Sequence, residues 1–173
     1  MGYTNYHEQH RNFTHDEWDE IRTFTQSIID IAASASLMNI LHNTEPSSYD
    51  GAIPLGDASG EEKPLITSDY IMLNGVDEHG HESFCVKREK PAHDDFCKTA
   101  QKPYDQVCMA IYCMIEHVAP DALNFSSDGE NEEDFCKAGI ALWDMAHATI
   151  IDPHASKQNT NQTYSLFDAR RYA

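Results

Sequence analysis

The segment that begins at Thr14 constrains the fold more than any other part of the sequence. Thr14 and Glu17 have the spacing of a capping box, and Phe13 and Trp18 have the spacing of a hydrophobic staple. Apolar residues then recur at helical spacing. The pattern predicts a helix from residue 15 to about residue 41 that buries one face.

The rest of the chain alternates between strand and helix signals. Strands are expected at 65–76, 82–88 and 122–126, with a hairpin joining the first two. Two further helices are expected, one opening near Pro103 and stopped by Pro120, the other opening at Asn131 and stopped by Pro153. The order helix, strand, strand, helix, strand, helix predicts one α+β domain with a three-stranded antiparallel sheet and helices on one face.

Four segments carry no clear periodicity. We expect a long mobile loop at 43–63, an irregular stretch at 89–101, and flexible termini at 1–13 and 154–173 around a domain that spans 14–152. An alternative for the tail is that it docks as a short arm through Tyr164, Leu166 and Phe167.

Charge narrows the possible partners. Asp and Glu total 29 against 12 Lys and Arg, a formal net charge of −17 over 173 residues. Such a charge repels nucleic acid and anionic membranes and favours basic partners.

The sequence also bears on location. No apolar run approaches the roughly 20 residues of a membrane span, and the N-terminus lacks a signal-peptide core, so we expect a cytoplasmic protein. Five cysteines, an odd number, are expected to be reduced.

Two acidic runs are candidate binding surfaces. They consist of Asp128, Glu130, Glu132, Glu133 and Asp134, and of Asp16, Glu17, Asp19 and Glu20. Carboxylates in such arrays could imitate the phosphates of a nucleic acid and occupy a basic groove. The alternative is a solvated surface in which acids stabilise the N-terminal ends of helices.

One segment of this acidic chain is rich in basic residues. Five of the 12 cations lie between Lys87 and Lys102. The candidate anion site at this corner consists of Lys98, Lys102, Tyr104, Ser126 and Ser127, because a helix N-terminus with a nearby lysine binds phosphate or carboxylate. The alternative is that these lysines pair with surrounding carboxylates.

Metal and thiol chemistry have weaker signals. His79, His81 and Glu82 lie in one turn and are candidate metal ligands, with His93 or Asp94 as a possible third partner. A solvated polar turn explains them better, because no second half of a metal site is visible, and no cofactor is expected. Cys97 is either a reactive thiol beside a cation or a small core residue.

Four strings resemble those of a family of small proteins that is widespread in bacteriophages and prophages. They are Leu73-Asn74-Gly75-Val76, His81-Glu82-Ser83-Phe84, the run from Phe96 to Asp105, and Ser126-Ser127-Asp128-Gly129. The resemblance covers about residues 65–150 and carries no catalytic residue with it. It implies an accessory protein of the bacterial cytoplasm, of a kind that often inhibits host defence or redirects a host factor.

Two functions follow as hypotheses. The first is a non-enzymatic protein that binds and inhibits a host defence protein with a basic surface, by means of the two acidic runs. The alternative is a binding protein, or a small enzyme, for an anionic nucleotide-like ligand at the Lys98–Lys102 corner. A metal-dependent hydrolase at His79, His81 and Glu82 is a third, weaker hypothesis.

Overall fold

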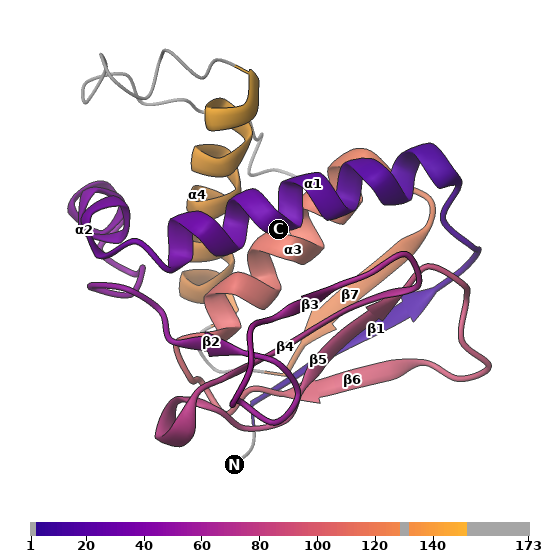
Figure 1. The fold of residues 1–173 in the computed structure, drawn as a ribbon, viewed down its shortest axis with the longest axis horizontal. Coiled ribbons are helices and arrows are strands. Elements are labelled where there is room, and N and C mark those ends of the chain that lie inside the picture. The colour runs from indigo at the N-terminus through magenta and orange to yellow at the C-terminus, as the bar shows by residue number, and fades with distance from the viewer. Residues whose placement is uncertain (1–2, 129–131, 152–173) are drawn as a thin grey trace.

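The computed structural model describes residues 3–128 and 132–151, without the side chains of residues 132, 133 and 135. It confirms an α+β fold (Figure 1). The helices are α1 (His15–Ala32), α2 (Ala35–Thr44), the short 3-10 helix η1 (Asp77–His79), α3 (Asp105–Val118) and α4 (Glu132–Ile151). The strands are β1 (Thr4–Gln9), β2 (Leu55–Gly56), β3 (Leu65–Ile66), β4 (Tyr70–Gly75), β5 (Phe84–Lys87), β6 (Asp95–Lys98) and β7 (Leu123–Ser127).

The strands form two antiparallel sheets instead of the single sheet that was expected. One has the order β6-β1-β7, and the other has β4 at its centre, paired with β2, β3 and β5. The expected hairpin is confirmed as β4 with β5, in which Tyr70 is opposite Lys87. The strand expected at 65–76 is two strands, because the Thr67 hydroxyl accepts hydrogen bonds from the backbone N–H groups of Asp69 and Tyr70 and turns the chain between them.

The expectation of a flexible segment at 1–13 was wrong for residues 4–9, which form β1, the central strand of its sheet. The irregular stretch at 89–101 likewise contains the edge strand β6. Both strands were missed because they lack the apolar alternation of a half-buried strand. The folded unit therefore begins before residue 14.

Local signals set the start of α1 but not its end. The capping box is present, with Glu17 N–H donating to Thr14 Oγ1 at 3.2 Å, and the rings of Phe13 and Trp18 lie 5.6 Å apart. The helix ends at Ala32 instead of about residue 41. Ser34 then caps α2 by accepting a hydrogen bond from Leu37 N–H, and the chain bends by 89° between the two helices.

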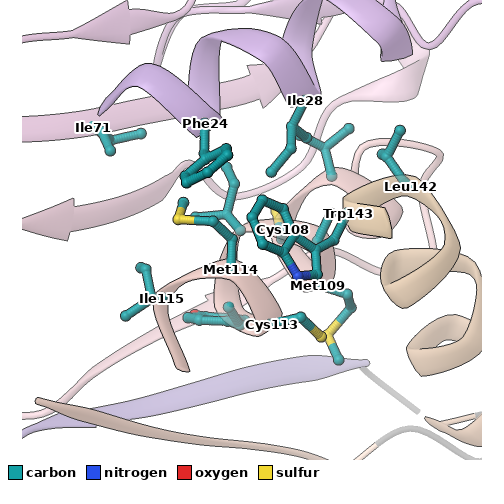
Figure 2. Close-up of a cluster of buried hydrophobic side chains, with 14 of the residues drawn as sticks. Phe24, Ile28, Ile71, Cys108, Met109, Cys113, Met114, Ile115, Leu142 and Trp143 are labelled. Atoms are coloured by element: carbon teal, nitrogen blue, oxygen red, sulfur yellow. The ribbon is translucent and has the colours of Figure 1, made fainter. Parts of the chain in front are cut away.

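Helix α3 is the centre of the molecule. Every residue from Asp105 to Ile115 is buried, because the sheet of β6, β1 and β7 covers one side of the helix, and α1 and α4 cover the other. Figure 2 shows side chains of the three helices meeting in this cluster, in which the rings of Phe24 and Trp143 lie 4.8 Å apart, edge to face. The segment expected to be a mobile loop at 43–63 carries β2 and buries Ile53 in the same core.

Among the described residues, no single helix has the length and apolar character needed to cross a membrane, although α1 and α2 taken together pass that test as a bent pair.

Candidate functional site

The acidic run at the start of α1 is exposed except at Glu17. Asp16, Asp19 and Glu20 face solvent, and Asp19 pairs with Arg22 at 3.2 Å. Asp19 and Arg22 also border a shallow hollow with Ile66. A shallow hollow of this polar character does not enclose a ligand, and Asp19 is the one member of the run that borders it.

Glu17 has a structural partner. The guanidinium of Arg11 donates to both oxygens of Glu17 at 2.8 Å and to Asp121 Oδ1 at 2.6 Å. The hydrogen bonds from Arg11 lower the pKa of Glu17 to about 2. Arg11 therefore ties the segment after β1 to α1 and to the turn before β7, and Glu17 is part of this anchor.

The second acidic run is only partly described. Glu130 lies outside the described residues, as do the side chains of Glu132 and Glu133. Asp134 is exposed and lies 3.9 Å from the Lys137 ammonium. Asp128 is exposed, and its carboxylate accepts hydrogen bonds from the Thr4 backbone N–H at 2.6 Å and the Tyr6 hydroxyl at 3.3 Å.

Asp134 and the first acidic run lie toward opposite ends of α4. Glu20 acts electrostatically on His147, and the His147 ring lies 5.7 Å from Phe24 of α1. His147 follows Asp134 by 13 residues, which is about 20 Å along a helix. Asp134 therefore lies apart from the first run along α4.

The structure does not assemble the expected anion site. Lys98 is opposite Thr4 and Ser127 is opposite Asn5, so the two residues share one end of a sheet, as expected. They lie on different strands, because β1 separates β6 from β7. Tyr104, however, is fully buried, which makes it wrong as a ligand contact. Its hydroxyl donates to the Glu82 carbonyl at 2.6 Å.

The remaining members of the corner do not converge either. The Lys102 ammonium donates to the Glu78 carbonyl at 2.7 Å, and the Ser127 hydroxyl donates to the Thr4 carbonyl at 3.4 Å. Lys98 and Ser126 are exposed, but they lie on β6 and β7, the two strands that flank β1. Among the described residues, the corner therefore offers separate polar groups that do not converge.

The run from Phe96 to Asp105 is a junction that holds β6, β1 and α3 together. The Asp105 carboxylate is buried, and its Oδ1 accepts hydrogen bonds from Asn5 Nδ2 and Thr99 Oγ1, both at 2.6 Å. Burial raises the pKa of Asp105 to about 6, although its hydrogen bonds oppose the change. The turn between Thr99 and Asp105 places Ala100 and Gln101 in the left-handed region, at φ of 51° and 59°. The string that looked most like a ligand site therefore has a structural role.

A second buried polar contact lies on the same face of β1. His7 Nδ1 and the Tyr112 hydroxyl lie 3.0 Å apart, and burial lowers the pKa of His7. Burial also raises the pKa of Tyr112. Both groups therefore stay neutral near pH 7, and the contact satisfies two polar groups inside the core.

The metal and thiol hypotheses also fail on geometry. His81 Nδ1 lies 2.8 Å from the Lys98 carbonyl, and Glu82 Oε2 accepts the Lys98 backbone N–H at 3.0 Å. These two contacts connect the segment before β5 to the end of β6. No group of three or more His, Cys, Asp or Glu in the described part of the chain could hold a metal ion, and His79 is part of no such group. Cys97 is a buried residue whose thiol donates to the Glu82 carbonyl, which makes the reactive-thiol interpretation wrong.

Sequence reasoning missed the outer face of the β6-β1-β7 sheet. Tyr6 and Phe96 are 43% and 51% exposed there, and their ring centroids lie 6.5 Å apart. Lys98 reaches over Phe96, with its ammonium 5.8 Å from the ring centre. Recognising β1 and β6 as neighbouring strands would have placed the two rings together, since Tyr6 is opposite Phe96.

No family model, no curated protein and no solved structure matches this chain. The features that bear on its function are therefore its charge and the side chains that the fold exposes.

Proposed function

We propose that this chain is a small acidic accessory protein of phage type, without enzymatic activity, that binds and inhibits a bacterial defence protein with a basic surface in the host cytoplasm. The observation that carries this proposal is the excess of carboxylates. If every Lys and Arg paired with one acid, 29 minus 12 would still leave 17 carboxylates without a cation of their own. Such a field attracts a basic partner and raises the association rate by roughly 10- to 1,000-fold.

The arrangement of the acids favours a broad field over close imitation of a nucleic-acid backbone. Asp134 of the second run precedes His147, on which Glu20 of the first run acts, by about 20 Å along α4, which exceeds the Debye length of about 10 Å at 0.1 M salt. Each run would therefore act on a separate basic region of the partner. The alternative, a site for an anionic nucleotide-like ligand, finds less support because Tyr104 is buried and Lys102 is engaged by the Glu78 carbonyl.

The test is binding to purified bacterial defence proteins across a salt series. We expect affinity to fall as salt rises, and charge reversal at Glu130, Glu132 and Glu133 to weaken binding and flatten the salt dependence. Replacing the same three residues by Asp, which keeps the charge, is the matched control and should change little. Binding that is insensitive both to salt and to charge reversal would refute the proposal.

A further inference from the structure

The outer face of the β6-β1-β7 sheet differs from the rest of this acidic surface because it displays aromatic rings. Side chains alternate along β1, so that Asn5, His7 and Gln9 face α3 while Tyr6 and Glu8 face away from it. Figure 1 shows the helices gathered on the other side of these strands. Most large aromatic side chains of the described residues, such as Trp18 and Tyr112, are buried instead.

Asp128 contacts Tyr6, and Glu8 lies on the same side of the strand. The Tyr6 hydroxyl donates to Asp128 Oδ2 at 3.3 Å, and Glu8, whose side chain is 57% exposed, is the next outward residue along the strand. Lys98 already lies over Phe96, the ring opposite Tyr6. Tyr6, which is opposite Ser126 on β7, is therefore the ring of the pair that contacts a carboxylate, and its face suits an incoming cation.

We propose that this face docks an arginine side chain of the basic partner, with the guanidinium stacked on Tyr6 and paired with Glu8 and Asp128. The inference deepens the proposed function and rests on it, because it names the contact that would turn a general attraction into a specific one. Arginine fits better than lysine because its planar guanidinium stacks on a ring and pairs with carboxylates at the same time.

Charge disfavours two other occupants of this face. The phosphates of a single-stranded nucleic acid, which also stacks on exposed aromatics, would meet Glu8, Asp128 and a net charge of −17. A second copy of this chain would bring another −17 toward the first. A basic protein segment meets Glu8, Asp128 and the opposite net charge of the molecule, although Lys98 also lies on this face.

The test uses two synthetic peptides of equal charge, nona-arginine and nona-lysine, titrated at low salt. The Tyr6→Leu variant keeps an apolar side chain on the strand but removes the ring, and Tyr6→Phe keeps the ring. We expect Tyr6→Leu to weaken nona-arginine binding by about two- to five-fold and nona-lysine binding less, while Tyr6→Phe keeps the arginine preference. Glu8→Gln should also weaken nona-arginine binding, which gives a second variant if Tyr6→Leu lowers the melting temperature of the protein too far for the titration.

Matched controls separate this face from the general field. Ile40→Ala removes an apolar side chain on α2 that is 43% exposed, as Tyr6 is, and Asp30→Asn removes one charge from α1. Neither should change the arginine preference. If nona-arginine binds but Tyr6→Leu has no more effect than Ile40→Ala, the docking site is refuted and the acidic-field proposal survives.

Two other outcomes would also overturn the inference. If neither peptide binds at low salt, the proposed function fails and the docking site fails with it. If Tyr6→Leu instead changes the sedimentation of the protein alone, and the association strengthens with salt, the occupant of the face is a second copy.

Discussion

The buried carboxyl of Asp105 makes stability depend on pH in a direction opposite to that of most carboxylates. Its folded-state pKa of about 6 lies above its ordinary value of 3.8. The unfolded chain therefore releases this proton more readily than the folded chain does. The stability that Asp105 contributes is fully present below about pH 3.8 and is lost as the pH rises through 6.

The magnitude follows from the difference between the two pKa values. The gap from 3.8 to about 6 corresponds to about 3 kcal/mol, of which about 2 kcal/mol falls between about pH 4.5 and pH 7.5. Asp105→Asn removes the charge but keeps Oδ1, which accepts from Asn5 and Thr99. As the pH rises from about 4.5 to about 7.5, the free energy of unfolding of the variant should increase by about 2 kcal/mol relative to that of wild type, which corresponds to about 4–8 °C in Tm.

The assay is urea unfolding of both proteins at the two pH values, supported by thermal melts. The difference between variant and wild type cancels the titration of groups that both proteins share. Asp144→Asn is a useful comparison, because burial also raises the pKa of Asp144 to about 6 but this half-buried group is screened by solvent and should give a smaller gain. If the difference between Asp105→Asn and wild type is the same at both pH values, the buried-carboxyl explanation is wrong.

Three further substitutions test other parts of the structure. Gly139→Ala would place a Cβ 2.6 Å from Met109 Cβ, so urea unfolding should show a loss of about 1–3 kcal/mol; a gain would mean that α3 and α4 separate easily. Ala100→Gly should raise the free energy of unfolding by up to about 1 kcal/mol, because glycine adopts the left-handed conformation at little cost; a loss would contradict the strain. Glu17→Gln should be less stable than wild type above about pH 4.5, by about 1 kcal/mol or less, and the difference should shrink as the pH falls toward 2, because the Arg11 hydrogen bonds lower the Glu17 pKa; thermal melts that differ equally at all pH values would contradict this.

The parts of the fold that sequence reasoning predicted are those set by neighbouring residues. The capping box at Thr14, the β4–β5 hairpin, the strand at 123–127 and the two later helices each depend on residues within one turn or one short run of chain. The end of α1 was missed because apolar periodicity continues past Ala32. A single side-chain cap at Ser34 redirects the chain there.

The strands β1 and β6 were missed because their partners are distant in the sequence. The inward residues of β1 are polar, and they are buried only because Asp105 and Tyr112, about 100 positions later, satisfy Asn5 and His7. Read alone, such a segment has the composition of a solvated terminus. A local sequence pattern cannot show that Asn5 and His7 are buried, because their partners, Asp105 and Tyr112, lie on α3, far along the chain.

The same limit explains the outcome for the candidate sites. Lys98, Lys102 and Tyr104 are close in the sequence, but Lys98 is exposed at the end of β6. The left-handed turn at Ala100 and Gln101 that follows it directs Lys102 toward the Glu78 carbonyl and Tyr104 into the core. Net charge, in contrast, needs no geometry and could be read directly.

β1 links the stability of this molecule to its proposed binding face. Its inward side anchors the Asp105 junction through Asn5, and its outward side presents Tyr6 between Glu8 and Asp128. Because side chains alternate along a strand, a slip of one residue in its pairing would bury Tyr6 and expose Asn5. The buried polar contacts of Asn5 and His7 prevent that slip, since leaving either group without its partner costs free energy. The polar inward residues that hid this strand from sequence reasoning are therefore what fixes the aromatic face outward.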